Sequence, residues 1–134
     1  NGIHDSILIL GYTPPEHFHY LIEQNIIQSL VSYDYAQKLD AYAKEAGTKI
    51  RCHCKVDTGM CRTGVIYQVQ EKNMDQILAE YRMEHLIVEG IFSHFPVSDD
   101  LGQESAAFTK KQIELFEEVC SNLRNRSGNP SYPE

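Results

Sequence analysis

Four side chains that can gain or lose a proton alternate along residues 50–57, in the run Ile-Arg-Cys-His-Cys-Lys-Val-Asp. If this run is a strand, Arg51, His53, Lys55 and Asp57 share one face, because successive side chains point to opposite sides. A turn bounded by glycines follows at once and carries Arg62. Taken alone, Lys55 and Asp57 favour an ordinary ion pair over a site, since structural ion pairs are common.

The cysteines in the same stretch suggest a metal site at first, but their spacing does not support one. Alternation places His53 opposite Cys52 and Cys54, and Cys-x-Cys lacks the spacer of the usual zinc motifs. We therefore predict no metal site. Cys61, on the turn beside Arg62, is a candidate nucleophile, although packing or simple solvent exposure explains it equally well.

The other face of the same strand is apolar, and helical patterns flank the strand on both sides, which indicates a parallel sheet covered by helices. In an open sheet of this kind, both faces of a central strand should be apolar. In a closed barrel the inner face becomes polar near the carboxyl end, where active sites lie. The half-polar strand and its glycine-bounded turn therefore predict part of a (β/α)8 barrel.

The remaining patterns predict four consecutive βα units, with parallel strands and helices outside. The expected strands are residues 7–11, 26–31, 50–57 and 86–95, and each is followed by a helical pattern. Thr13 and Glu16 form a capping box for the first helix, and Ser32 caps the second, which ends at Gly47. Met74, Ile77, Leu78 and Tyr81 mark the third helix. Thr109 and Gln112 form a capping box for the fourth, which should run to about Arg126 and stop at Gly128.

Composition narrows the class of protein. The chain has 134 residues, which we interpret as one segment, and a formal net charge of -7, which disfavours binding to nucleic acid. Its apolar runs are far shorter than a membrane span. The four cysteines do not form the pattern of a secreted disulfide framework, which favours reduced thiols and a cytoplasmic location.

The run His-Cys-Lys-Val-Asp-Thr-Gly-Met-Cys-Arg-Thr-Gly at residues 53–64 closely resembles the lysine-to-arginine signature of alanine racemases and of the racemase domain of serine/alanine racemases. Residues 7–16, 89–100 and 108–116 resemble other parts of the same family in order and spacing. The resemblance covers nearly the whole chain. It implies part of the N-terminal barrel of a pyridoxal-phosphate-dependent amino-acid racemase, a homodimeric isomerase that supplies D-alanine for peptidoglycan precursors.

The resemblance also implies roles for four residues. Arg62 would contact the carboxylate of the small amino-acid substrate and the phenolic oxygen of the cofactor, and Lys55 matches a lysine that is carbamylated in many members. His94 matches a histidine in a network that reaches the catalytic tyrosine of the partner subunit. A carbamate on Lys55 or the carboxylate of Asp57 could anchor the Arg62 guanidinium. Cys61 and Thr63 depart from the family's commonest residues, which leaves alanine or serine open as the substrate.

The same resemblance places the Schiff-base lysine before residue 1 and the catalytic tyrosine after residue 134. We therefore expect the chain to contain no catalytic base and to be inactive by itself, whereas the parent enzyme racemises. The alternative is a self-contained, non-catalytic α/β module that binds a carboxylate or a protein partner.

Overall fold

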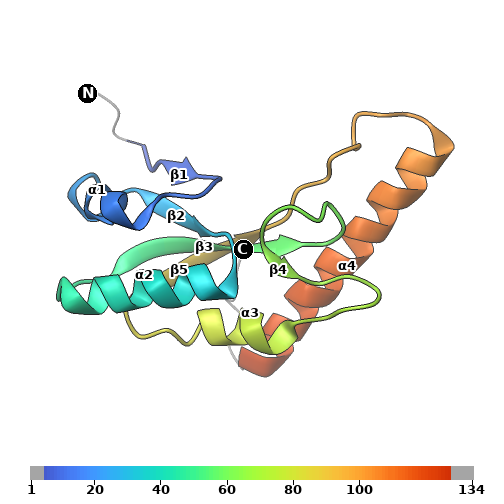
Figure 1. Cartoon of the computed structure of the whole chain (residues 1–134). Helices are drawn as coiled ribbons and strands as arrows, with labels where there is room; N and C mark the ends of the chain where they lie inside the picture. The colour runs from blue at the N-terminus through green and yellow to red at the C-terminus, as the bar shows by residue number, and fades with distance from the viewer. Residues whose placement is uncertain (1–4, 128–134) are drawn as a thin grey trace.

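A computed structural model describes residues 5–127 of the chain, in which parallel strands alternate with helices (Figure 1). All four predicted βα units are present, so the predicted α/β alternation is confirmed. No helix within the described residues combines the length and the apolar composition needed to cross a membrane. The strands are β1 (Leu8–Ile9), β2 (Ile27–Leu30), β3 (Ile50–Asp57), β4 (Val65–Ile66) and β5 (Leu86–Phe92). The helices are η1 (Pro15–His17), α1 (Phe18–Glu23), α2 (Tyr33–Glu45), α3 (Met74–Glu80) and α4 (Gln103–Ser127).

Strand β3 is the centre of the sheet. It pairs in parallel with β2 and with β5, its last two residues pair with the short β4, and β1 extends the sheet beyond β2. Figure 1 shows α2 and α3 on the same side of the sheet, with the long α4 crossing behind the end of β3 and extending beyond it. The carboxyl ends of the parallel strands therefore lie at one edge, as in the barrel that the sequence predicts.

The alternation predicted for β3 is confirmed. Ile50, Cys52, Cys54 and Val56 are all at most 2% exposed. The first two pack in a core with α1 and α2, and the last two pack in a second core with α3 and α4. Apolar burial on this face attaches the helices to the sheet.

The parallel pairing of β3 with β5 contains an irregularity. The register shifts between Cys52 and His53, so that Glu89 is skipped and His53 lies opposite Gly90. A Cβ at Gly90 would lie 2.6 Å from the His53 ring, so no larger residue fits without a shift. The skipped Glu89 instead accepts two hydrogen bonds from Arg51, at 2.6 and 3.2 Å.

Two helix-end signals act as predicted. The Ser32 hydroxyl accepts a hydrogen bond from the Tyr35 amide at 3.2 Å and caps α2. Gly47 follows the end of α2 with φ +64°, in the left-handed region where glycine is unstrained.

Two predicted capping boxes are wrong. The Thr13 side chain does not cap a helix, because its hydroxyl donates to the buried Gln28 side chain at 2.6 Å, and the first helical turn is the 3₁₀ segment η1. Helix α4 begins at Gln103, six residues before Thr109, so Thr109 and Gln112 lie in its interior. The side chain of Asp100 organises this earlier start by accepting bonds from the Gly102 amide and the Ser105 hydroxyl.

The strand boundaries also differ from the prediction. Strand β5 ends at Phe92, three residues early, and β1 and β2 are shorter than expected. Strand β4 was not predicted, since two residues are too few to show a period. The predicted stop at Gly128 lies outside the described residues.

A buried carboxyl on α3 generates a pH prediction. Glu80 is fully buried, and burial raises its pKa from the ordinary 4.5 to about 8, although the nearby Cys54 thiol partly opposes this rise. The folded protein therefore keeps this proton up to about pH 8, whereas the unfolded chain releases it near pH 4.5. The folded state is penalised increasingly as the pH rises between these values.

We predict that Glu80→Gln has a higher free energy of unfolding than the wild type and that the difference grows from pH 5 to pH 8. The slope approaches about 1.4 kcal/mol per pH unit, and the difference becomes constant above pH 8. Urea unfolding at several pH values measures this, with the exposed Glu84→Gln as control. The same pH dependence of stability in Glu80→Gln and in the wild type would contradict the assignment.

Candidate functional site

The carboxylate of Asp57, the last residue of β3, organises the turn that follows. Its Oδ1 accepts the amides of Gly59 and Cys61 at 2.9 and 3.0 Å, and its Oδ2 accepts the amide of Arg62 at 2.9 Å. The side chain of Gln68 adds a fourth donor at 3.3 Å. Burial raises the pKa of Asp57, but the bonds from these donors outweigh it and hold the pKa below its ordinary value. The carboxylate therefore stays charged and fixes the turn.

The glycines of the turn allow its close approach to the sheet. Gly59 has φ +148°, and Gly64 has φ +116° and donates its amide to the Val31 carbonyl at 2.7 Å. A Cβ at Gly64 would lie 2.8 Å from the Lys55 carbonyl oxygen, so a larger residue would push the turn away from β3. Both ends of the turn are thus attached to the sheet.

Lys55 lies where the ends of three strands meet, and it is only 6% exposed. Its Nζ donates to the carbonyl of Leu10, just after β1, at 3.4 Å, and lies 5.6 Å from the centre of the Phe92 ring at the end of β5. No carboxylate of the described residues is in ion-pair contact with it. Burial lowers the pKa of Lys55, the charge of Arg62 lowers it further, and Asp57 partly opposes both. The ordinary ion pair that Lys55 and Asp57 favour when taken alone is not among the ion pairs of the described residues.

The side chain of Arg62 is exposed, and among residues 5–127 its guanidinium has no ion pair or hydrogen bond. Asp57 binds the backbone amide of Arg62. The Asp57 carboxylate, one of the two anchors expected for the guanidinium, here binds the backbone amide instead, and the anchoring role itself stays a prediction. The backbone of Arg62 is fixed while its charged group stays available.

His94 lies two residues past the end of β5, and its side chain is exposed. The loop that carries it is linked to the turn after β3 by a 2.9 Å hydrogen bond between the hydroxyls of Thr58 and Ser93. The buried Gln112 of α4 donates to the His94 carbonyl at 3.3 Å. Sequence patterns gave no signal for Thr58 or Ser93, and they assigned Gln112 to a helix cap.

The cysteines do not form a functional cluster. Cys52 and Cys54 point into the two cores, and burial raises the pKa of both thiols far above the ordinary value. Cys61 is exposed on the turn, in the left-handed region with φ +58°. Within the described part of the chain, no three His, Cys, Asp or Glu side chains are grouped so that they could hold a metal ion.

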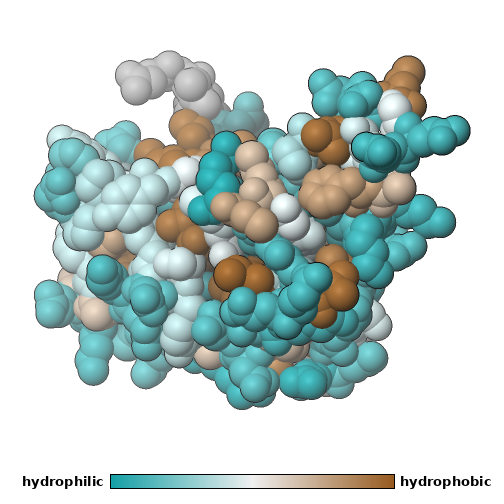
Figure 2. Space-filling view, turned by 45° about the vertical axis from the view of Figure 1, so that its right-hand side comes forward, coloured by the Kyte–Doolittle hydropathy of each residue, from teal (hydrophilic) through white to brown (hydrophobic). Residues whose placement is uncertain are grey.

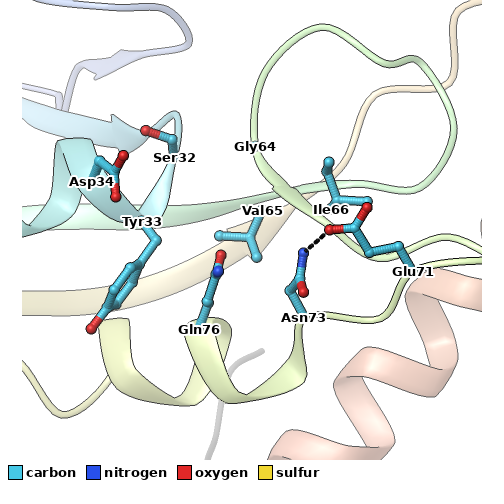
Figure 3. Close-up of a pocket in the computed structure, with 9 residues that line it drawn as sticks. All are labelled: Ser32, Tyr33, Asp34, Gly64, Val65, Ile66, Glu71, Asn73 and Gln76. Carbon is cyan, nitrogen blue, oxygen red and sulfur yellow. Dashed lines mark hydrogen bonds between the residues drawn. The ribbon is translucent and has the colours of Figure 1, made fainter.

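A pocket of about 280 Å³ lies outside this site, between the start of α2, β4 and the start of α3 (Figure 3). One of its walls carries a hydrogen bond of 2.8 Å from the Asn73 side chain to Glu71. Gly64 borders the pocket, but Lys55, Asp57, Arg62 and His94 do not line it. The candidate site is instead the group of strand ends around Lys55 and the turn of Arg62.

Comparison with known proteins identifies the family to which these residues belong. Residues 1–132 match the family described as alanine racemase, N-terminal domain. The chain belongs to this family. The resemblance stated from residues 53–64 is therefore confirmed.

Relatives of this racemase-family chain are considerably longer. It is 36% identical over 127 residues to alanine racemase 1 of Clostridium acetobutylicum, covering 95% of this chain and 32% of the relative. It is 42% identical over 123 residues to an amino-acid racemase of Enterococcus faecalis, covering 92% of this chain and 16% of that protein. The fold matches alanine racemase of Clostridium difficile 630 in complex with cycloserine, with TM-score 0.83, 32% identity, and coverage of 96% of this chain and 34% of that one. The chain thus spans between 16% and 34% of the length of these relatives, and the prediction of a partial barrel is confirmed.

Proposed function

We propose that this chain is part of a pyridoxal-phosphate-dependent racemase that interconverts L- and D-alanine or serine, and that it supplies the arginine for the substrate carboxylate. The observation that carries the proposal is the free guanidinium of Arg62 on a turn fixed by Asp57. A fixed backbone lowers the ordering cost of binding, and a guanidinium binds a carboxylate through two parallel hydrogen bonds. Membership of the alanine racemase family supports the choice of substrate.

The charges around Arg62 suit an anionic cofactor group. Arg62 places an exposed cation at the strand ends, and no carboxylate of the described residues pairs with its side chain. The phenolic oxygen of pyridoxal phosphate would lie against Arg62, whose cation stabilises negative charge there. When bound, this cofactor supplies the electron-withdrawing ring that makes the α-proton of the amino acid acidic.

We propose that Lys55 is carbamylated in the working enzyme. Its neutral amine attacks carbon dioxide to form the N–C bond of a carbamate and releases one proton. Burial favours this neutral amine by lowering the pKa of Lys55. The product replaces one of two adjacent cations with an anion that can hold the Arg62 guanidinium. This anchor takes the place of the Asp57 carboxylate, whose oxygens are used by the turn.

In this proposal His94 and the two catalytic bases, a lysine and a tyrosine, act together only in the full-length enzyme. The exposed imidazole of His94 is available to residues outside this sequence, in a network that reaches the catalytic tyrosine of a partner subunit in a homodimer. The lysine that holds the cofactor and the tyrosine would come from outside residues 1–134, so the chain by itself would be inactive. The parent would be cytoplasmic and would make D-alanine for peptidoglycan precursors.

The activity is tested with the full-length protein that contains this sequence. We expect pyridoxal-phosphate-dependent racemisation of alanine or serine, assayed with both enantiomers. Arg62→Ala should reduce kcat/KM about 100-fold, or about 2.7 kcal/mol of transition-state stabilisation, with little change in melting temperature. The exposed Arg82→Ala is the matched control. Unchanged kcat/KM in Arg62→Ala would remove the assigned role, and carboxylate binding without racemisation would favour the non-catalytic module.

The state of Lys55 has a separate test. With ¹³C-labelled bicarbonate, the wild-type protein should show a carbamate carbon signal in its NMR spectrum, and Lys55→Met should lose that signal. Lys49→Met, which removes an exposed lysine next to the same strand, should keep it. A signal that persists in Lys55→Met would assign the carbamate elsewhere, and its absence from the wild type would refute carbamylation.

A further inference from the structure

The buried stripe along one side of α4 is apolar toward the end of the helix and polar nearer its start. Leu115, Val119 and Leu123 are at most 4% exposed and pack in the core with α3 and β3. Continuing the stripe toward the start of the helix gives Gln112 and then Thr109, at the spacing that places them on the same side. Figure 1 shows that this part of α4 lies beyond the sheet, beside the loop that follows β3. The stripe therefore becomes polar where it leaves the core and meets the loops of the candidate site.

Gln112 contacts both loops that carry the proposed site residues. It is 1% exposed, and its Nε2 donates to the His94 carbonyl at 3.3 Å. The same nitrogen would lie 3.5 Å from a Cβ at Gly59, in the turn that holds Arg62. The Phe108 ring, one turn earlier, would lie 3.2 Å from the same Cβ. The Gln112 side chain thus lies between the His94 loop and the Arg62 turn.

This placement leaves two polar atoms without partners. The Oε1 of Gln112 and the hydroxyl of Thr109 are buried, and neither has a hydrogen bond. Burying a polar atom without a partner destabilises a protein, so an apolar residue of similar size at position 112 would suit the packing better. The space-filling view shows apolar side chains on the projecting part of the molecule (Figure 2). Leu101 and Phe108, near the start of α4, are exposed. An amide at position 112 is therefore not explained by packing.

We propose that Gln112 is a positioning residue that holds the His94 loop in place against the Arg62 turn. The inference rests on the proposed racemase function, because that function makes the relative position of the two loops matter. The amide donor of Gln112 acts on the backbone of the His94 loop and touches neither substrate nor cofactor. Its loss lets the two loops separate while the core beneath them stays intact.

The test replaces Gln112 by methionine in the full-length protein, which removes the donor and the unpaired oxygen but keeps nearly the same volume. We expect an equal or higher melting temperature together with a KM for alanine about fivefold or more above the wild type. Amide hydrogen exchange should become faster in residues 58–62 and 93–95. Gln112→Leu, which also removes both the N–H donor and the unpaired oxygen, should raise KM similarly. The control is Gln103→Met, at an exposed position of α4.

The outcomes separate this inference from the proposed function. A KM within twofold of the wild type in both Gln112 variants, or a rise in KM accompanied by a lower melting temperature in Gln112→Met, overturns the positioning role. If the wild type does not racemise, the proposed function fails. Faster exchange in the two loops of Gln112→Met then still supports the contact, and unchanged exchange overturns it.

Discussion

The turn after β3 depends on one interaction, the acceptance of three backbone amides by the carboxylate of Asp57. The amides of Gly59, Cys61 and Arg62 point at a single buried side chain, so the path of the turn is determined by where that carboxylate lies. Hydrogen bonds to a charged acceptor are worth more than neutral ones, about 1.5–3 kcal/mol each. Along this path Gly64 approaches β3 so closely that an added Cβ would lie 2.8 Å from the Lys55 carbonyl oxygen.

Fixing the backbone of Arg62 through its amide has a functional consequence. The guanidinium is left without a partner among the described residues, and the buried ammonium of Lys55 lies nearby without a carboxylate. The exposed guanidinium at the strand ends is the group to which we assign the substrate carboxylate in our proposal. The apolar face of β3 carries the two cores that keep this arrangement rigid.

The sequence predicts those parts of the fold that depend on local pattern. The alternation along β3, the Ser32 cap and the glycine at position 47 each depend on neighbouring residues, and all three are found as predicted. The two wrong capping boxes show what such patterns miss, because hydrogen bonds outside the predicted boxes decide the local structure. The Thr13 hydroxyl binds the buried amide of Gln28, far away in sequence, and no local pattern shows this.

In the candidate site, too, the sequence predicts the residues but not the tertiary contacts that they make. Lys55, Asp57 and Arg62 are predicted from the resemblance of residues 53–64 to the racemase signature, whereas the hydrogen bonds of Asp57 depend on the backbone conformation of the turn. The link from Thr58 to Ser93 joins the ends of β3 and β5, and it could not be predicted without the sheet register. Glu80 is buried on α3, although it is not among the residues that mark the predicted third helix.

The most direct test of the account is a measurement of the pKa of Asp57 by NMR, with the amide shifts of Gly59, Cys61 and Arg62 followed in the same titration. The account predicts a pKa below the ordinary 3.8 and three amide signals that titrate together with the carboxyl. The stability contributed by Asp57 should be present above pH 4 and lost as the pH falls through this lower pKa. A pKa at or above 3.8, or amide signals that do not respond to the carboxyl, would contradict the claim that Asp57 holds the turn.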